Sequence, residues 1–261
     1  MEDGSGNDQL QGAPMIKINF RNNRFEEECQ NITDLLTLKG SFHNRMKQYL
    51  CSRLYLDIEI IQTAKDERQI ENYLNPRLYT LYRESEVQRQ KKLAAIREKW
   101  EDSKEEIEEL LDCIYQPKSG IDLDICAKLS INYVCPYDYE NYTFDINYRK
   151  STEEMLETCV HELIHFFWFP VWEDLFGTKC NAQQDPLAWK LSELAIDALF
   201  KETELKKYCV SETPAHQCFY EIEIEGMSLV EIFRHMFKQN DLKSFMKQGY
   251  EFFKSHEAIL E

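Results

Sequence analysis

The stretch His161-Glu162-Leu163-Ile164-His165, or HELIH, is the most informative part of this chain, because it matches the pattern H-E-x-x-H. On an α-helix, residues i and i+4 lie one above the other on the same face, so both imidazoles can reach one metal ion. Glu162 stands beside them, where a carboxylate can act as general base on a water whose pKa zinc has lowered from about 16 toward about 7. The pattern predicts a helix that carries two zinc ligands and a catalytic base.

The residues around the motif favour this helix. Ser151 and Glu154 have the S-x-x-E spacing of a capping box, in which each side chain accepts a hydrogen bond from a free N–H of the first turn. Pro170 is expected to limit how far the helix runs. An apolar face recurs at spacings of three and four, through Met155, Leu156, Cys159, Val160, Leu163 and Ile164. The alternative is a core helix whose two histidines only donate hydrogen bonds.

A catalytic zinc takes three protein ligands as a rule, so a third must lie elsewhere. The extended pattern H-E-x-x-H-x-x-G-x-x-H would need Gly and His where this chain has Trp168 and Val171, which excludes the metzincin arrangement. Glu173 and Asp174 follow the motif closely and are competing third ligands.

A second predicted helix offers another acidic pair. Asp185 is its expected N-cap and Pro186 its first residue. Glu193 and Asp197 are again spaced i and i+4, so Glu193 can bind the metal while Asp197 accepts a hydrogen bond from a ligand histidine. The apolar side consists of Leu187, Leu191, Leu194, Ala195, Ala198 and Leu199.

With these residues the chain resembles the gluzincin branch of the zinc metallopeptidases, in which H-E-x-x-H is followed by E-x-x-x-D on a helix that faces the first across the zinc. The resemblance covers about residues 128 to 200. It implies peptide-bond hydrolysis, a zinc ion held by His161, His165 and Glu193, Glu162 as the base, and Asp197 as the residue that orients one histidine, expected to be His161.

The residues before the motif read as two strands, 128–134 and 143–148, rich in β-branched and aromatic side chains. Phe144, Ile146 and Tyr148 alternate with Asp145 and Asn147. Turn residues between the strands predict a hairpin or short meander. If the second strand is a sheet edge it can hold an extended peptide, and the alternative is a covered structural strand.

Amide hydrolysis also needs a group that stabilises the oxyanion, and the candidates downstream are His216, Tyr220 and His235. The sequence does not rank them. His216 lies between Cys209 and Cys218, which suggests a second metal site, but the paired C-x-x-C spacing of such sites is missing, and ordinary loop residues are the favoured interpretation.

Composition restricts the class of protein. A chain of 261 residues with 43% hydrophobic residues can form one substantial core or two modest domains. The net charge of -16 argues against nucleic-acid or anionic-membrane partners. Nine cysteines without repeating spacing are typical of reduced thiols in a cytoplasmic protein, and neither a signal peptide nor a membrane span is expected.

Further elements are expected outside the motif region. Ile16, Ile18 and Phe20 suggest a short strand, and 42–63 fits a helix or a strand, with helix favoured on length. A long charged helix is expected over 78–115, closed by Pro117. Two more amphipathic helices are expected over 229–237 and 242–253.

Together these features predict a mostly helical α+β fold, with a zincin-like core and a small β-sheet over the active-site helix. The expected division is a disordered tail, 1–15, a helical N-terminal region, 16–117, and a zincin-like metallopeptidase domain, 118–261. The expected function is zinc-dependent hydrolysis of a peptide or protein substrate, with Glu162 assisting the attack of a zinc-bound water.

Two alternatives remain. One is a zinc-containing, non-catalytic regulatory or protein-binding module, in which the metal stabilises the core. The other is a regulatory intracellular protease that cleaves one protein partner, for which general peptides would be poor substrates.

Overall fold

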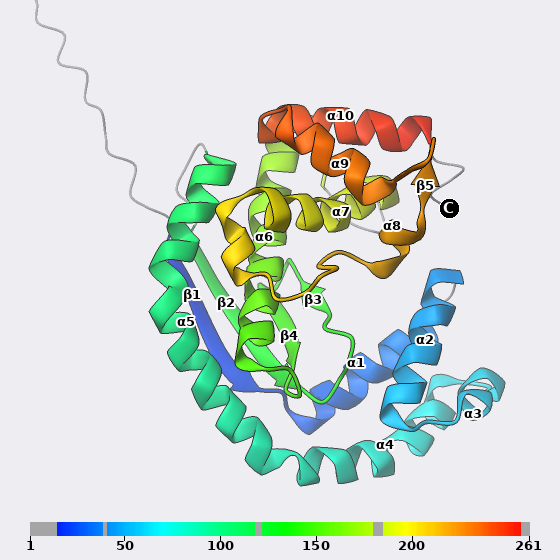
Figure 1. The fold of residues 1–261 in the computed structure, drawn as a ribbon. Helices are drawn as coiled ribbons and strands as arrows, with labels where there is room; N and C mark the ends of the chain where they lie inside the picture. Colours follow the sequence, from blue (N-terminus) through cyan, green and yellow to red (C-terminus); the bar gives the residue numbers. More distant parts are fainter. Residues whose placement is uncertain (1–14, 39–40, 118–121, 180–184, 257–261) are drawn as a thin grey trace, which may run out of the picture. The chain divides into compact units, whose positions relative to one another are not determined.

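In a computed structural model, the chain is described over residues 15–38, 41–117, 122–179 and 185–256. Within these ranges it forms ten α-helices and a small four-stranded mixed sheet (Figure 1). The predicted mostly helical α+β class is confirmed. The predicted tail lies outside the described residues, except for its last residue.

The first half of the chain contains one strand, five helices and then three strands. These are β1 (Met15–Asn22), α1 (Phe25–Thr37), α2 (Ser41–Leu54), α3 (Ile58–Thr63), α4 (Glu67–Glu84), α5 (Glu86–Tyr115), β2 (Asp122–Ser130), β3 (Tyr137–Asp138) and β4 (Thr143–Asn147).

The second half is mainly helical. Its elements are α6 (Thr152–Phe176), α7 (Pro186–Glu202), a short 3-10 helix η1 (Glu204–Tyr208), α8 (Gln217–Glu221), a two-stranded sheet of β5 (Glu223–Ile224) and β6 (Met227–Ser228), α9 (Leu229–Lys238) and α10 (Leu242–Ser255). The two predicted C-terminal helices are confirmed as α9 and α10.

The chain folds as two compact units, each made of stretches that are separate in sequence. Unit 1 takes the described residues within Met1–Lys17, Ser103–Leu123 and Leu163–Glu261, and unit 2 those within Ile18–Asp102 and Asp124–Glu162. The chain therefore passes between units inside β1, α5, β2 and α6.

The sheet has the strand order β1-β2-β4-β3. The predicted strand at Ile16, Ile18 and Phe20 is confirmed as β1, with these three side chains buried in alternation. The predicted hairpin is wrong, because β2 and β4 run parallel, with Cys126 opposite Thr143 and Ser130 opposite Asn147. The intervening segment supplies β3, which pairs antiparallel with β4 and takes the edge position.

β4 is a central strand, so the suggestion that it is a sheet edge able to hold a peptide is wrong, and the alternative of a covered structural strand is confirmed. Asp145 and Asn147 are buried like their apolar neighbours. Asp145 accepts hydrogen bonds from Asn23 at 3.2 Å and Asn31 at 2.9 Å, and lies 3.4 Å from the Lys128 ammonium across the strand pair. These partners compensate a buried carboxylate, whose pKa burial nevertheless raises.

A second buried acid lies on α1. Glu28 accepts hydrogen bonds from the Ser130 hydroxyl at 2.6 Å and the Ile131 amide at 2.9 Å, where β2 ends. Burial raises its pKa to about 7, although both hydrogen bonds act in the opposite direction. The two contacts tie α1 to the sheet of unit 2.

The long charged helix predicted over 78–115 is interrupted once. Helix α4 ends at Glu84 and α5 begins at Glu86, with Ser85 between them. The Ser85 hydroxyl donates to the Tyr82 carbonyl, and buried Arg89 donates to both Ser85 Oγ and the Tyr82 carbonyl. Hydrogen bonds of Ser85 and Arg89 therefore stabilise the break between α4 and α5. The sequence did not predict the break, because the spacing of these residues also fits a continuous helix.

The ambiguous segment 42–63 is helical, as favoured, but it forms two helices. Tyr55, between α2 and α3, has φ 55, a left-handed conformation that ends a helix. Asp57 then caps α3 by accepting a hydrogen bond from the Glu59 amide at 2.9 Å.

Helix α6, which carries the motif, begins at the predicted capping box. The Ser151 amide donates to Glu154 Oε2 at 2.6 Å, and the Glu154 amide donates to Ser151 Oγ at 3.1 Å. The prediction that Pro170 limits the helix is wrong, since α6 continues through it to Phe176. Aromatic side chains on both sides of Pro170 are buried, and their packing outweighs the hydrogen bond that proline cannot donate. They are Phe166, Phe167, Trp168, Phe169 and Trp172.

The capping box predicts a stability effect. Replacing Ser151→Ala removes the side-chain bond to the Glu154 amide, and we expect the free energy of unfolding to fall by about 1 kcal/mol. Urea unfolding followed by circular dichroism measures this. Glu153→Gln alters an exposed residue of the same turn and should change stability by less than about 0.5 kcal/mol. Equal losses in the two variants would contradict the capping role.

In unit 1, α7 packs against α9 and α10 (Figure 1). The approach of α10 is close at Gly249, where an added Cβ would lie 2.9 Å from Leu191 Cδ1 and 3.0 Å from Phe233 Cε1. A glycine therefore lets the three helices approach closely at this point.

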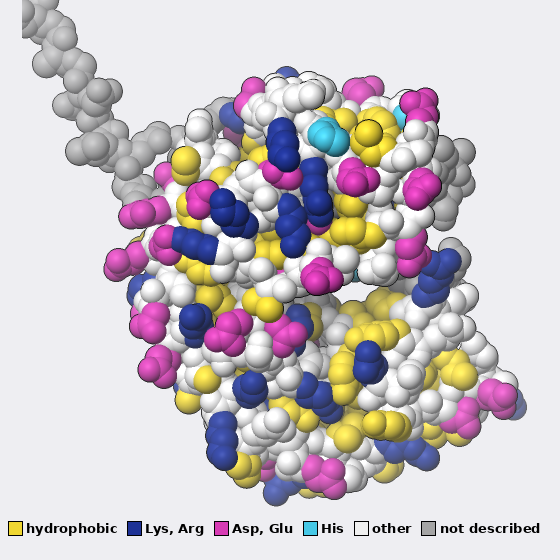
Figure 2. Space-filling model, in the orientation of Figure 1, with side chains coloured by type: hydrophobic (Ala, Val, Ile, Leu, Met, Phe, Trp, Pro, Cys, Tyr) yellow, Lys and Arg dark blue, Asp and Glu magenta, His cyan; other side chains and the backbone are white. Residues whose placement is uncertain are grey.

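The described helices include none that combines the length and the apolar character needed to cross a bilayer. On the face drawn in Figure 2, Lys and Arg side chains are interspersed with Asp and Glu side chains. The negative net charge is thus not concentrated in one acidic patch on that face.

Candidate metal centre

Helix α6 places the two motif histidines one turn apart on one face. It is buried on nearly all sides from Met155 to Trp172, as expected for a helix that is apolar around its whole circumference. His165 is only 1% exposed, while His161 is half-buried. His161 is thus the more exposed of the two histidines.

Helix α7 supplies the acidic partner. It starts as predicted, with Pro186 as its first residue and Asp185 accepting a hydrogen bond from the Ala188 amide at 3.0 Å. Every residue from Leu191 to Phe200 is buried, and Glu193 and Asp197 are 3% and 1% exposed. Carboxylates are rarely this buried without a cation or a metal nearby.

The structure brings His161, His165 and Glu193 together. One ligand atom from each lies within 4.8 Å of the others, and His165 Nε2 is 3.5 Å from Glu193 Oε1. Around a tetrahedral zinc with bonds of about 2.0–2.1 Å, neighbouring ligand atoms lie roughly 3.4 Å apart. Two imidazoles and one carboxylate are also a donor set that zinc takes in catalytic sites. The three residues form a group that could hold a metal ion.

The competing third ligands lie elsewhere. Glu173 and Asp174 are in the last turns of α6, and neither belongs to the group of ligand atoms around His161 and His165. Because α6 continues through Pro170, these two residues follow His165 along the same helix. At about 1.5 Å per residue, they lie roughly 12 Å further along its axis than His165.

Glu162, between the histidines, is 5% exposed.

Burial raises the pKa of the Cys135 thiol to about 11, with a small addition from the Glu162 charge, and both effects raise the pKa of Cys159 further. The two thiols near the motif therefore remain protonated at neutral pH, and protonated thiols are poor metal ligands.

His216, one of the oxyanion candidates, lies beside the group. It is the N-cap residue of α8, and its Nε2 is 3.4 Å from Glu193 Oε2, the oxygen that does not face His165. Burial lowers the pKa of His216, but the hydrogen bond and charge of Glu193 outweigh it, so the net shift is upward. The side chain is 43% exposed. Each oxygen of Glu193 thus faces a different histidine.

Asp197, predicted to orient a ligand histidine, has other partners. Among the described residues its hydrogen bonds come from the Tyr220 hydroxyl at 2.5 Å and from Arg234 Nε and Nη2 at 2.5 and 2.9 Å. Tyr220, an oxyanion candidate, is thereby engaged with Asp197. The third candidate, His235, lies exposed on α9.

The sequence does not predict the role of Arg234 as the cation that pairs with Asp197. A buried carboxylate such as Asp197 requires a cation, but charge alone does not indicate which of the 31 Lys and Arg residues supplies it. The usable signal is its position on α9, next to buried Phe233, where a charged residue on the inner side of an amphipathic helix needs a partner.

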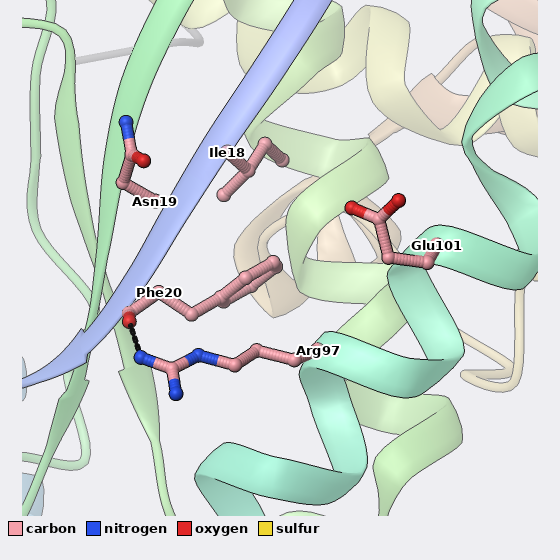
Figure 3. Close-up of a pocket in the computed structure, with 5 residues that line it drawn as sticks. All are labelled: Ile18, Asn19, Phe20, Arg97 and Glu101. Carbon is pink, nitrogen blue, oxygen red and sulfur yellow. Dashed lines mark hydrogen bonds between the residues drawn. The ribbon is translucent and has the colours of Figure 1, made fainter.

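A separate cavity of about 320 Å³ lies in unit 2 (Figure 3). It is lined by Ile18, Asn19 and Phe20 of β1 and by Arg97 and Glu101 of α5. Arg97 points across it and donates to the Phe20 carbonyl at 2.5 Å. The guanidinium of Arg97 is thus bound to the backbone. None of the five residues that line the cavity belongs to the group formed by His161, His165 and Glu193.

Comparison with known proteins adds no further constraint. No family model matches the chain, and neither a curated protein nor a solved structure matches it.

Proposed function

We propose that this chain is a zinc-dependent metallopeptidase with a zincin-like, gluzincin-type centre. The observation that carries the proposal is the convergence of His161, His165 and Glu193, two ligands on α6 and one on α7, with ligand atoms within 4.8 Å of one another. Glu162 adjoins these ligands on α6. Ligands alone would serve a structural ion, but the adjacent buried carboxylate favours hydrolysis.

In this proposal Glu162 does the proton chemistry. It accepts a proton from the attacking water and later delivers it to the leaving amine nitrogen, so that one carboxylate serves as base and then as acid. A zinc ion held by His161, His165 and Glu193 would polarise the substrate carbonyl and lower the pKa of water in the site. The burial of Glu162 keeps bulk water away from this transfer.

The neighbouring side chains hold Glu193 in place. His216 donates toward Glu193 Oε2, which leaves Oε1 directed at His165. One turn further along α7, Asp197 joins Tyr220 and Arg234 and thereby fixes α7 against α8 and α9. We assign Asp197 to this anchoring role, and His216 remains the best placed of the oxyanion candidates.

Removal of the metal tests the proposal directly. The full chain, purified with zinc, is expected to contain about one zinc per chain and to cleave members of a peptide library. A chelator should abolish cleavage, and added zinc should restore it. Protein without zinc, or cleavage insensitive to chelation, would contradict the proposal.

A protease for a single protein partner would leave such a library intact. Cells that express the active chain should then show new protein termini absent from cells that express Glu162→Gln. Absence of cleavage in both assays, with zinc present, would favour the non-catalytic module instead.

A further inference from the structure

Unit 2 carries a stack of alternating tyrosine and arginine side chains that the proposed chemistry does not use. We call it the Tyr-Arg ladder. Its members come from three separate segments, one on α2, one after β2 and one after β4, and they are Tyr49, Arg53, Tyr133, Tyr148 and Arg149.

The ladder is continuous through the ring of Tyr133. The guanidinium carbon of Arg53 lies 5.2 Å from the ring centroid of Tyr49 and 5.9 Å from that of Tyr133. The guanidinium carbon of Arg149 lies 4.6 Å from the Tyr133 centroid and 4.4 Å from that of Tyr148. Tyr49 also meets Tyr133 edge-on, at 6.4 Å. Two cations therefore share one aromatic ring.

The charges of these two arginines are not neutralised by carboxylates of the described residues. Arg53 is exposed and makes cation–π contacts with the two rings, and Arg149 donates to the Ile131 carbonyl at 3.0 Å. By contrast, Arg21 and Arg234 each bind a carboxylate, at 2.7 and 2.5 Å. The chain has 47 acidic and 31 basic residues. Two arginines at one ring without a carboxylate partner therefore form a locally positive site on a negatively charged protein.

Stacking on tyrosine rings determines how these arginines can bind. A guanidinium that lies against a ring keeps its in-plane N–H groups for other partners, and that geometry matches the two oxygens of a carboxylate. Two like charges at one ring also repel each other, and an anion bound near both reduces this cost. Tyr49, 45% exposed, leaves the end of the ladder accessible.

We propose that the Tyr-Arg ladder binds an acidic polypeptide segment through Asp or Glu carboxylates. The net charge of -16 repels every polyanion, and a nucleic acid, with a charge on each nucleotide, is repelled more strongly than a short peptide whose few carboxylates two cations can pair. The inference concerns binding and goes beyond the proposed hydrolysis, so it holds or fails independently of catalysis.

The test uses the full chain and a fluorescein-labelled peptide in which Glu alternates with Gly. Fluorescence anisotropy at low salt should show binding about tenfold tighter than that of the same peptide with Gln in place of Glu. Arg53→Gln should weaken binding of the Glu peptide about tenfold, because it removes one charge-assisted contact. Arg149→Gln should do the same.

The matched control is Arg77→Gln. Arg77 is also exposed and stacks on a tyrosine one turn earlier, Tyr73, at 4.0 Å, but outside the ladder. Its loss should leave binding unchanged. Equal binding of the Glu and Gln peptides, an equal loss with Arg77→Gln, or tighter binding of a single-stranded oligonucleotide would each overturn the proposal. Should Arg149→Gln fail to fold without its bond to Ile131, the exposed Arg53→Gln variant decides.

Discussion

Glu162→Gln is expected to reduce the rate of peptide hydrolysis by about 10²- to 10⁴-fold, the usual contribution of a general acid–base residue. Glutamine has nearly the same shape as glutamate but cannot accept the proton of the attacking water. The proposed ligands His161, His165 and Glu193 are untouched, so zinc content should stay at the wild-type level. Single-turnover cleavage assays and elemental analysis of the same preparations measure both quantities.

Glu157→Gln is the matched control. Glu157 lies earlier on α6 and is also largely buried, at 8% exposed, but it is not part of the motif. It should retain wild-type activity. A Glu162→Gln variant with full activity would rule out the proposed base, and an equal loss in the two variants would point to general damage to α6. Loss of function in Glu162→Gln alone, with zinc retained, separates an enzyme from a module in which zinc is structural.

Glu193→Gln is expected to reduce zinc affinity by more than about 100-fold, because even residues that only support zinc ligands change affinity by about 10- to 100-fold. An amide oxygen is a far weaker zinc ligand than a carboxylate, and the two histidines alone cannot complete the site. Competition with a chromophoric chelator measures the affinity of each variant.

The control for Glu193 is Glu173→Gln, which tests the competing ligand near the end of α6. Its zinc affinity should equal that of the wild type. The reverse result, with zinc lost from Glu173→Gln and kept by Glu193→Gln, would show that the metal is held differently from the group formed by His161, His165 and Glu193.

Local patterns predicted the helices around the site well. The capping box at Ser151 and the N-cap at Asp185 each act over three residues, so neighbouring sequence alone determines them. The spacing of His161 and His165 likewise fixes their shared helix face. Glu193 could be proposed from its spacing to Asp197, because two acids on the polar side of an apolar helix stand out. The structure then places Glu193 beside His165.

Long-range packing accounts for what the sequence did not predict. The parallel register of β2 and β4 depends on a connection through β3, which turn residues do not distinguish from a hairpin. Helix α6 passes Pro170 because the surrounding aromatic side chains stabilise it. Asp197 pairs with Arg234, 37 residues away, and no short-range pattern links them. Each outcome depends on contacts between distant segments.

The four passages of the chain between the two units have a consequence for dissecting the protein. All four occur inside regular elements, β1, α5, β2 and α6, and not in loops. A fragment that starts at residue 118 would keep the three residues of the candidate metal centre but lose β1 and α5, which contribute to both units. Shortened versions are therefore unsuitable for assigning roles to the N-terminal helices. Point substitutions in the intact polypeptide are the appropriate tool.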